Sequence, residues 1–481
     1  MRPAGPSHRE VGWAFLLCVA YVALSLALRL ATGPALEVDE AEVWLQAQLG
    51  YALGYGPQFP LYYWIQFGLF DVFGKSLAVI DIFRSTLMAL TVFFAFLALR
   101  QAVGAMSASL AAASLIFLPD YAWVSQMTLT HTRIMAALAM ATFVAFAWFL
   151  RTGRMAAIVW LGVALGLGGL SKPNFWFVPI ILSLAALSIP AYRARMRDKR
   201  LLLALVIGAA IVVAPYGWII LHPTEALASI NKFALPKPGT RMIVTLIGLF
   251  DLTKWALYAM LPLVFLVAIF RSFCAHRPDD SAPDAEVFAL FCMRAAFSGF
   301  AIAILFVVLA GAGQFKSHWL MFATPFAAFA LVLPLLARMS LLQRRIWGAL
   351  AILAVIGTQT SLAVLRDTPP ATHALDAEAL AHDLEQRFGA DRLTVIGDFY
   401  WSGNLARTRP DWDVRALTPP GSVDGEILML TKLPIGSPEG ILRWLKLGEW
   451  SAGQQVVLTP AFIAPSTEDR PVHARILTPP G

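Results

Sequence analysis

Acidic and aromatic side chains crowd a short segment near the start of the chain. Residues 37–44 read Glu-Val-Asp-Glu-Ala-Glu-Val-Trp, and the stretch 54–64 adds five aromatic residues. A carboxylate within hydrogen-bond reach of a hydroxyl can take its proton as a new bond forms, an effect worth about 10²–10⁴ in rate. The segment therefore holds candidate catalytic carboxylates, Asp39 and Glu40. The alternative is a solvated helix start, where the helix dipole favours acids.

Several basic side chains could stabilise an anionic leaving group, whose growing charge needs fixed cations or amide dipoles. Arg84 is the most informative, because a charge inside an apolar span is costly unless paired and usually marks a functional site. Asp81, three residues earlier on the same expected helix, could instead satisfy it. The candidates for substrate binding are Arg84, His131, Arg133, Lys172, Lys316 and His318.

Each of the other cations also has a simpler explanation. Lys172 could snorkel from the end of a span to the membrane interface. Lys316 and His318 flank a tight turn and could be ordinary interfacial residues. His131 and Arg133 open an expected span in a Thr-Leu-Thr-His-Thr-Arg segment, where threonines could cap the helix. The residues alone leave both interpretations open.

The elements that position these residues are expected to be membrane helices. The chain has 481 residues, of which 58% are hydrophobic and 14% charged, and its mean hydropathy is +0.68. Soluble domains are about 45–50% apolar and 25% charged. About eleven stretches approach the roughly 20 apolar residues that cross a bilayer as a helix. They are 11–31, 77–99, 103–119, 134–150, 156–170, 174–192, 201–221, 254–270, 295–312, 319–337 and 346–365.

Basic residues between the spans predict the orientation. Cytoplasmic loops carry an excess of Lys and Arg, and with a cytoplasmic N-terminus the clusters fall in alternate loops. The net charge of +7 is therefore an orientation signal and not a nucleic-acid surface. The acidic segment, the loop 222–250, the connection 314–318 and everything after Leu365 then face outside. The inside residues are Arg100, Arg151, Arg154, Arg193, Arg195, Arg197, Lys199, Arg200, Arg271, Arg277, Arg338, Arg344 and Arg345.

The domain prediction follows from a change in composition near residue 366. Residues 1–365 form the transmembrane domain, with an acidic first outside loop at 33–76, and residues 366–481 form a small α/β domain outside the membrane. That tail predicts a helix near 373–388 and strands at 393–396, 427–430 and 456–458. The cytoplasmic loop 274–286 is expected to be a mobile connector.

The first outside loop predicts contacts with the membrane surface. Trp44, Tyr62, Tyr63 and Trp64 suit an interfacial aromatic belt, and residues 39–53 could form an amphipathic helix lying on the bilayer. Tyr62 and Tyr63 are also candidate substrate contacts. The three cysteines form no CxxC motif, and neither a disulfide framework nor a structural zinc site is indicated.

Five motifs in this order resemble the polyprenyl-phosphate-dependent glycosyltransferases of the GT-C fold. The resemblance is to the branch with the protein mannosyltransferases, the lipid A aminoarabinose transferase and the rhizobial lipopolysaccharide galacturonosyltransferases. It covers roughly the first two thirds of the chain. The motifs are Asp39-Glu40-Ala41, Pro60 to Trp64, Arg84, Gly169-Leu170-Ser171-Lys172 and Phe315 to Trp319.

The resemblance implies an inverting transfer of a sugar from a polyprenyl-phosphate donor. Asp39 would be the base for the acceptor hydroxyl, and Glu40 would orient or bind. Relatives often have an acid near His131, so a second carboxylate there is in doubt, and Asp120 is the nearest substitute. The acceptor would be lipopolysaccharide or lipid A, another envelope glycan or a protein. The resemblance implies no required cofactor, although a divalent cation is possible, and it implies a bacterial inner membrane with the active site and tail in the periplasm.

Two other functions also fit a many-span chain. A transporter or flippase of a lipid-linked sugar would usually show internal repeats and broken spans with polar groups near mid-membrane, whereas here charge and aromatics crowd one face. An O-antigen polymerase or ligase would be expected to concentrate function in a large late loop, and the acidic loop is early.

Overall fold

The computed structural model describes residues 7–127, 129–274, 283–367, 374–418, 423, 425–432, 437–461 and 471–480. The chain divides into two compact units, and each is described by itself. Unit 1 comprises Met1–Leu24, Ala52–Trp64 and Ile82–Thr358. Unit 2 comprises Ser25–Tyr51, Ile65–Asp81 and Gln359–Gly481. The predicted outside tail therefore forms one unit with parts of the first outside loop, which the predicted boundary at residue 365 did not include.

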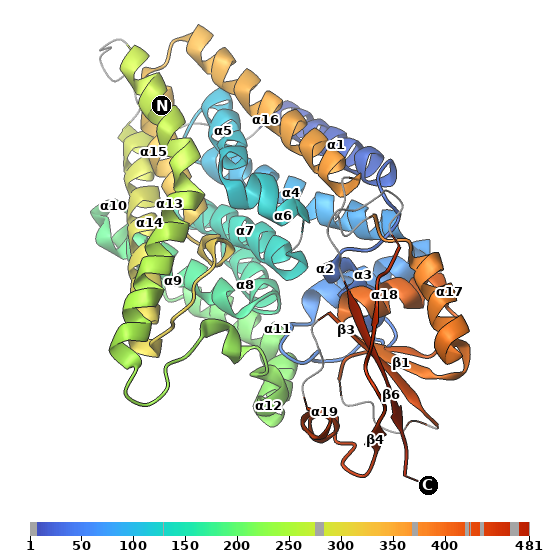
Figure 1. Ribbon diagram of the computed structural model, residues 1–481. Helices are drawn as coiled ribbons and strands as arrows, with labels where there is room; N and C mark the ends of the chain where they lie inside the picture. Colours follow the sequence, from blue (N-terminus) through green and yellow to red (C-terminus); the bar gives the residue numbers. More distant parts are fainter. Residues whose placement is uncertain are drawn as a thin grey trace. The chain divides into compact units, whose positions relative to one another are not determined.

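Long apolar helices confirm a multi-pass membrane protein (Figure 1). Seven are long and apolar enough to cross a bilayer among the described residues, and an eighth span arises if a bent pair counts as one. That pair, Ala105–Phe117 and Asp120–Met127, is bent by 78°. The seven are α1 (His8–Leu30), α4 (Leu77–Leu99), α7 (Thr130–Thr152), α11 (Leu201–Leu221), α13 (Arg241–Phe273), α14 (Pro283–Ala310) and α16 (Leu341–Asp367).

The expected count of eleven spans is only partly confirmed. Three expected spans are the shorter apolar segments α8 (Met155–Gly169), η3 (Pro173–Trp176) with α9 (Phe177–Ser188), and α15 (Thr324–Arg338). At 1.5 Å per residue, the 15 residues of α8 reach about 22 Å, less than the roughly 30 Å of hydrocarbon. Short helices connect the long ones. They are α2 (Val38–Gln46), α3 (Leu61–Phe73), α5 (Ala105–Ala113), η1 (Ser114–Phe117), η2 (Asp120–Val124), α6 (Ser125–Met127), α10 (Pro190–Met196), α12 (Pro223–Ala226), η4 (Ile230–Phe233) and η5 (Ser317–Leu320).

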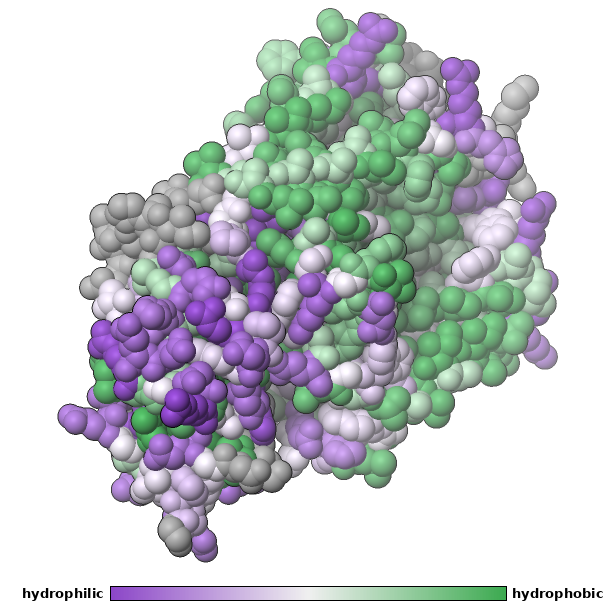
Figure 2. All heavy atoms as spheres, turned by 90° about the vertical axis from the view of Figure 1, so that its right-hand side faces the viewer, coloured by the Kyte–Doolittle hydropathy of each residue, from purple (hydrophilic) through white to green (hydrophobic). Residues whose placement is uncertain are grey.

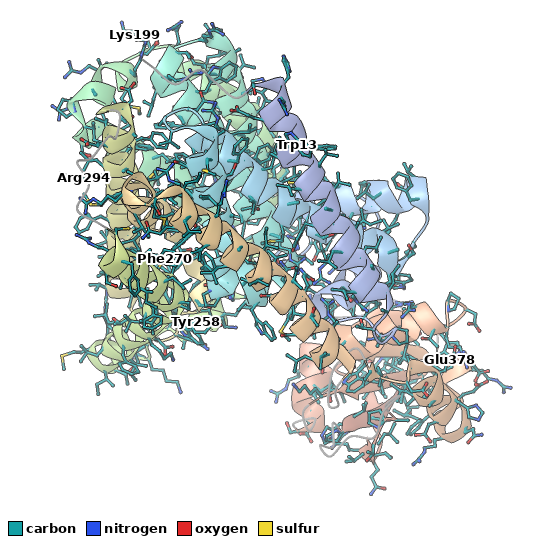
Figure 3. The ribbon with its side chains drawn as sticks, turned by 90° about the horizontal axis from the view of Figure 1, so that it is seen from above. Trp13, Lys199, Tyr258, Phe270, Arg294 and Glu378 are labelled. Carbon is teal, nitrogen blue, oxygen red and sulfur yellow. The ribbon has the colours of Figure 1, made fainter. Side chains whose placement is uncertain are left out.

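Small residues and phenylalanines build the core of unit 1. A Cβ on Gly162 would lie 2.9 Å from the carbonyl oxygen of Ala204, and one on Gly166 would lie 2.6 Å from Ile211, so glycine is what lets α8 and α11 pack closely. The same core joins α7, α14 and α15 through stacked rings around Phe143. The outward faces of the helices carry aliphatic and aromatic side chains, and Figure 2 shows them as green areas. Trp13, labelled on α1 in Figure 3, is 60% exposed.

The loops predicted to be cytoplasmic are tied together within unit 1. Arg100 at the end of α4 pairs with Glu10 of α1 at 3.0 Å. Arg200 donates to the carbonyl of Gly153 at 3.1 Å, which joins the loop after α7 to the one before α11. Gln343 donates to the carbonyl of Phe273 at 3.0 Å. Each of these contacts joins two segments that the alternation of charge assigns to the same side of the membrane.

Two local predictions are wrong in extent. Helix α13 begins at Arg241, so residues 241–250 of the expected loop 222–250 are helical. Helix α2 ends at Gln46, whereas an amphipathic helix to residue 53 was expected. Gly50 follows with a φ of +68°, a conformation that a continuing helix excludes. Most of the predicted mobile connector at 274–286 lies outside the described residues.

The C-terminal segment in unit 2 forms a mixed sheet with helices, as predicted. The strand order is β2-β1-β3-β6-β4, with β5 also paired to β6. β1 is parallel to β2 and β3, while β6 is antiparallel to β3. The predicted helix and three strands are present, and α18, α19, β2, β4 and β6 were not foreseen. The elements are α17 (Ala377–Phe388), η7 (Ala390–Arg392), β1 (Thr394–Gly397), α18 (Phe399–Thr408), β2 (Val414–Ala416), β3 (Ile427–Thr431), α19 (Pro438–Trp444), β4 (Ser451–Ala452), β5 (Val456–Leu458) and β6 (Val472–Thr478).

Candidate functional site

The acidic segment forms the start of helix α2 in unit 2. Glu37 is the N-cap, and its side chain and that of Glu40 form a capping box with each other's backbone. This arrangement satisfies amide donors that a helix start leaves without partners. Asp39 lies in the first turn and is partly buried, whereas Glu40 is fully buried. The two candidate carboxylates therefore occupy different environments one residue apart.

Glu40 is held by a buried arginine that the sequence analysis did not single out. Arg29, near the end of α1, is completely buried, and its guanidinium lies 3.1 Å from Oε2 of Glu40. The same carboxylate oxygen accepts the amide of Glu37 at 2.9 Å. From sequence, Arg29 looks like a cation snorkelling from a span end, and only burial distinguishes it. The geometry gives Glu40 the role of fixing the start of α2.

The rings of Tyr62 and Tyr63 pack against His131 in unit 1. Both tyrosines are fully buried at the start of α3, and their ring centroids lie 5.4 and 4.8 Å from that of His131 in α7. The expectation that they belong to an exposed interfacial belt is therefore wrong, because they pack inside the protein. Neither ring nitrogen of His131 has a hydrogen-bond partner among the described residues. A buried imidazole in that state is suited to meet a polar group of a ligand.

Arg84 binds the backbone at the end of α6. It is 1% exposed and donates to the carbonyls of Gln126 and Met127 at 3.2 and 3.1 Å. Leu129, the N-cap of α7, has a φ of +77°, which is rare for a non-glycine residue. Backbone strain of this kind is often found at functional sites. Arg133, one turn into α7, is 2% exposed.

Three lysines from separate loops gather around His318 in unit 1. Lys172 precedes η3, Lys232 lies in η4, and Lys316 precedes η5. Burial and the charges of these three lysines lower the pKa of His318 to about 3. Three of these four residues were predicted from the sequence, whereas Lys232 was not, because it sits in a loop without a recognisable motif. The cluster presents concentrated positive charge.

The loops of this cluster are fixed by contacts within unit 1. The ammonium of Lys172 donates to Oγ1 of Thr132 at 2.7 Å, so it also lies close to the His131 region. The amides of Gly313 and Gln314 both donate to the carbonyl of Phe233, at 2.9 and 3.3 Å, which joins the loop of Lys316 to η4. Gly313 is required there, because a Cβ would lie 2.9 Å from a backbone oxygen of Ala234.

Asp120, proposed as the substitute for a second carboxylate, is buried next to the same loops. Its Oδ1 accepts the hydroxyl of Ser317 at 2.6 Å, and its Oδ2 has no partner in the described part of the chain. Across the described ranges, no group of three or more His, Cys, Asp or Glu residues could hold a metal ion.

The predicted site residues fall into both units. Unit 1 brings together Tyr62, Tyr63 and His131, and it gathers Lys172, Lys316 and His318. Arg84 and Arg133 are buried in the same unit. Asp39 and Glu40 lie in unit 2. That these groups act on one substrate stays a prediction.

The fold is that of the GT-C membrane glycosyltransferases, which confirms the fold predicted from the motifs. ArnT from Cupriavidus metallidurans bound to undecaprenyl phosphate aligns with a TM-score of 0.59 at 13% identity, over 96% of this chain and 98% of ArnT. The Archaeoglobus fulgidus oligosaccharyltransferase aligns with a TM-score of 0.51 at 13% identity, over 92% of this chain and 72% of its own. At such identities the likeness concerns the fold.

Sequence comparisons point to the predicted branch. Residues 56–219 match the family described as dolichyl-phosphate-mannose-protein mannosyltransferase. The lipopolysaccharide core galacturonosyltransferases RgtB and RgtA of Rhizobium johnstonii are each 32% identical, over 44% and 55% of this chain. The matches cover 43% and 53% of those proteins, so the chain spans about half the length of the curated relatives it matches. The resemblance recognised in the motifs is confirmed.

Proposed function

We propose that this protein is a glycosyltransferase that moves a sugar from a polyprenyl-phosphate donor to an acceptor of the bacterial cell envelope. The observation that carries the proposal is the cluster of Lys172, Lys232 and Lys316 around His318. A polyprenyl phosphate is released with growing negative charge, and fixed cations stabilise such a leaving group in the transition state. ArnT, which shares the fold, was crystallised with undecaprenyl phosphate.

In this proposal Asp39 removes the proton of the acceptor hydroxyl. The hydroxyl oxygen attacks the anomeric carbon, the bond from that carbon to the phosphate oxygen breaks, and the phosphate keeps the electron pair. Configuration at the anomeric carbon is inverted because attack and departure occur on opposite faces. Asp39 is suited to this role because it is partly exposed, whereas Glu40 is committed to Arg29 and the helix start. A carboxylate base of this kind contributes about 10²–10⁴ in rate.

The charge of the cluster favours an acidic sugar. Three lysines supply more positive charge than the two negative charges of the departing phosphate monoester, and a uronic acid would bring a third negative charge. The relatives RgtA and RgtB are named galacturonosyltransferases of the lipopolysaccharide core. We therefore infer a uronic-acid donor and a lipopolysaccharide acceptor. The membrane would be the inner membrane, with the lysine cluster facing the periplasm, because the basic loops lie at the other ends of the helices.

The test is a transfer assay with purified protein in lipid nanodiscs. Polyprenyl phosphates carrying a labelled uronic acid, a neutral hexose or an amino sugar are offered with lipopolysaccharide. The proposal expects labelled lipopolysaccharide and released polyprenyl phosphate, with the uronic acid preferred. In parallel, proteoliposomes are assayed for movement of the same lipids between leaflets. Movement without transfer would favour a flippase and contradict the proposal.

A further inference from the structure

Side chains bind the backbone of residues 33–36, the segment that leads into α2. The four consecutive carbonyls of residues 33–36 each accept a hydrogen bond from a side chain. Arg29 donates to the first and the third, at 2.9 Å each. Arg407 of α18 donates to the second, and Asn404 of α18 donates to the fourth at 3.0 Å. Two of these donors come from a helix almost 370 residues further along the chain, and Figure 1 shows α18 beside α2.

Asn404 makes the most complete of these contacts. Its Oδ1 accepts the amide of Leu36 at 2.7 Å while its Nδ2 donates to the carbonyl of the same residue at 3.0 Å. Nδ2 also donates to the carbonyl of Tyr400 at 2.8 Å, which fixes the side chain on its own helix. The side chain is fully buried. Buried hydrogen bonds of this kind are costly to break, because each group left without a partner loses its solvation.

Close backbone packing reinforces the contact. A Cβ on Gly403 would lie 2.5 to 2.7 Å from the Cβ, Cα and carbonyl oxygen of Ala41, so only glycine permits this approach. Ala41 is two residues beyond Asp39 in the same helical turn. Asn404 therefore fixes the backbone on one side of the carboxylate, and Gly403 fixes it on the other.

We propose that α18 of the C-terminal segment is a positioning element for the carboxylate helix α2, with Asn404 and Arg407 as its positioning residues. The inference rests on the proposed function of Asp39 as the base and gives the tail a part in the reaction. Misplacing a reacting group by about 1 Å can cost 10²-fold in rate. The donor's phosphate is assigned to cations of unit 1, so a shift of α2 acts on turnover and leaves donor binding intact.

The experiment measures transfer kinetics of full-length Asn404→Ala, alone and combined with Asp39→Asn. The expected result for Asn404→Ala is a fall in kcat of about 10–100-fold, with the donor KM within twofold of wild type. Because Asn404 acts through Asp39, adding Asn404→Ala to Asp39→Asn should slow the residual rate no further. An equal loss in both backgrounds would overturn the proposal.

A matched control lies on the same helix. Arg409 ends α18 and pairs with Glu378 of α17, labelled in Figure 3, and not with the segment 33–36. Arg409→Gln should therefore keep kcat within about twofold. If Arg409→Gln lowered kcat as much as Asn404→Ala, changes elsewhere in the tail would slow transfer equally, and the proposal would be overturned.

If Asn404→Ala does not fold, Arg407→Lys tests the same contact between α18 and the segment 33–36. Lysine keeps a donor for the carbonyl of Pro34 but loses the planar fork of the guanidinium. The variant should show a smaller fall in kcat and faster amide exchange at residues 33–42, and wild-type values of both would contradict the proposal. The proposed function fails differently: if Asp39→Asn transfers at the wild-type rate, the base is wrong whatever Asn404 does.

Discussion

Neutralising Glu40 should destabilise the protein, because it breaks a completely buried ion pair. Glu40→Gln keeps an oxygen that can accept the amide of Glu37, so the capping box survives. What changes is the charge facing Arg29, whose guanidinium lies 3.1 Å from the carboxylate. The variant therefore isolates the electrostatic part of the interaction.

The magnitude follows from that distance and from burial. At 3.1 Å and an effective dielectric constant of about 20, the direct attraction is about 5 kcal/mol. Desolvation offsets part of it when the pair forms, but removing one partner leaves the other charge buried, and such changes cost about 3–5 kcal/mol. Arg29 keeps its bonds to two backbone carbonyls, so the lower end applies. For a cooperative unit of 150–250 residues, a loss of about 3 kcal/mol lowers the Tm by roughly 6–12 °C.

The assay is thermal unfolding of the detergent-solubilised protein, with Arg29→Gln/Glu40→Gln as the comparison. Removing both charges should cost less than removing one, since no buried charge remains and glutamine still offers a donor at position 29 and an acceptor at position 40. Transfer by the folded fraction of Glu40→Gln should fall less than that of Asp39→Asn, because Asp39, and not Glu40, is proposed as the base. An unchanged Tm in Glu40→Gln, or a double variant less stable than either single one, would refute the reasoning.

Three further results are expected. Gly403→Ala should lower stability by about 1–3 kcal/mol through overpacking against Ala41, while Gly448→Ala, with open space around it, should be neutral in the same melting experiment. Lys232→Gln should raise the donor KM about 3–10-fold by removing one charge from the cluster. Lys237→Gln, in the same loop, should leave the donor KM unchanged. If both substitutions raised the donor KM equally, Lys232 would have no specific part in donor binding. His318 should stay neutral between pH 5.5 and 8, since burial and lysine charge lower its pKa to about 3, and its neutral form is lost only as pH falls toward that value. His318→Gln should therefore keep the shape of the rate–pH profile in that range, and loss of a limb near pH 6.5 would contradict the assignment.

The order of motifs along the chain was enough to predict the fold and the branch. Hydropathy located the long helices, because each must satisfy its backbone inside the bilayer. The helix predicted at 156–170 is present as α8, although it is too short to count as a span by itself. The start of α13, where apolar and polar residues mix, was predicted too late in the chain. The tail revealed three strands through short runs of apolar residues. β6 was missed, although the alternation of His473 and Arg475 with apolar residues is typical of a half-buried strand.

The site was predicted by residue type but not by environment. Arg84 and Lys172 were chosen as candidates because charges in or at the ends of apolar spans are costly. Arg29 and Lys232 were not chosen, since one lies at the end of an apolar span and the other sits in a loop without a motif. Asn404 and Gly403 could not be found at all, because their importance lies in contacts across more than 360 residues, which no local pattern reveals.

The most direct test of the account is the single-turnover rate of Asp39→Asn at matched donor occupancy. Donor binding is first measured by titration with the polyprenyl-phosphate sugar, and the transfer step is then followed by rapid quench. For Asp39→Asn we expect an unchanged Kd for the donor and a transfer step at least about 100-fold slower than that of the wild type. A transfer step at the wild-type rate, with the donor equally bound, would contradict the claim that this carboxylate is the base.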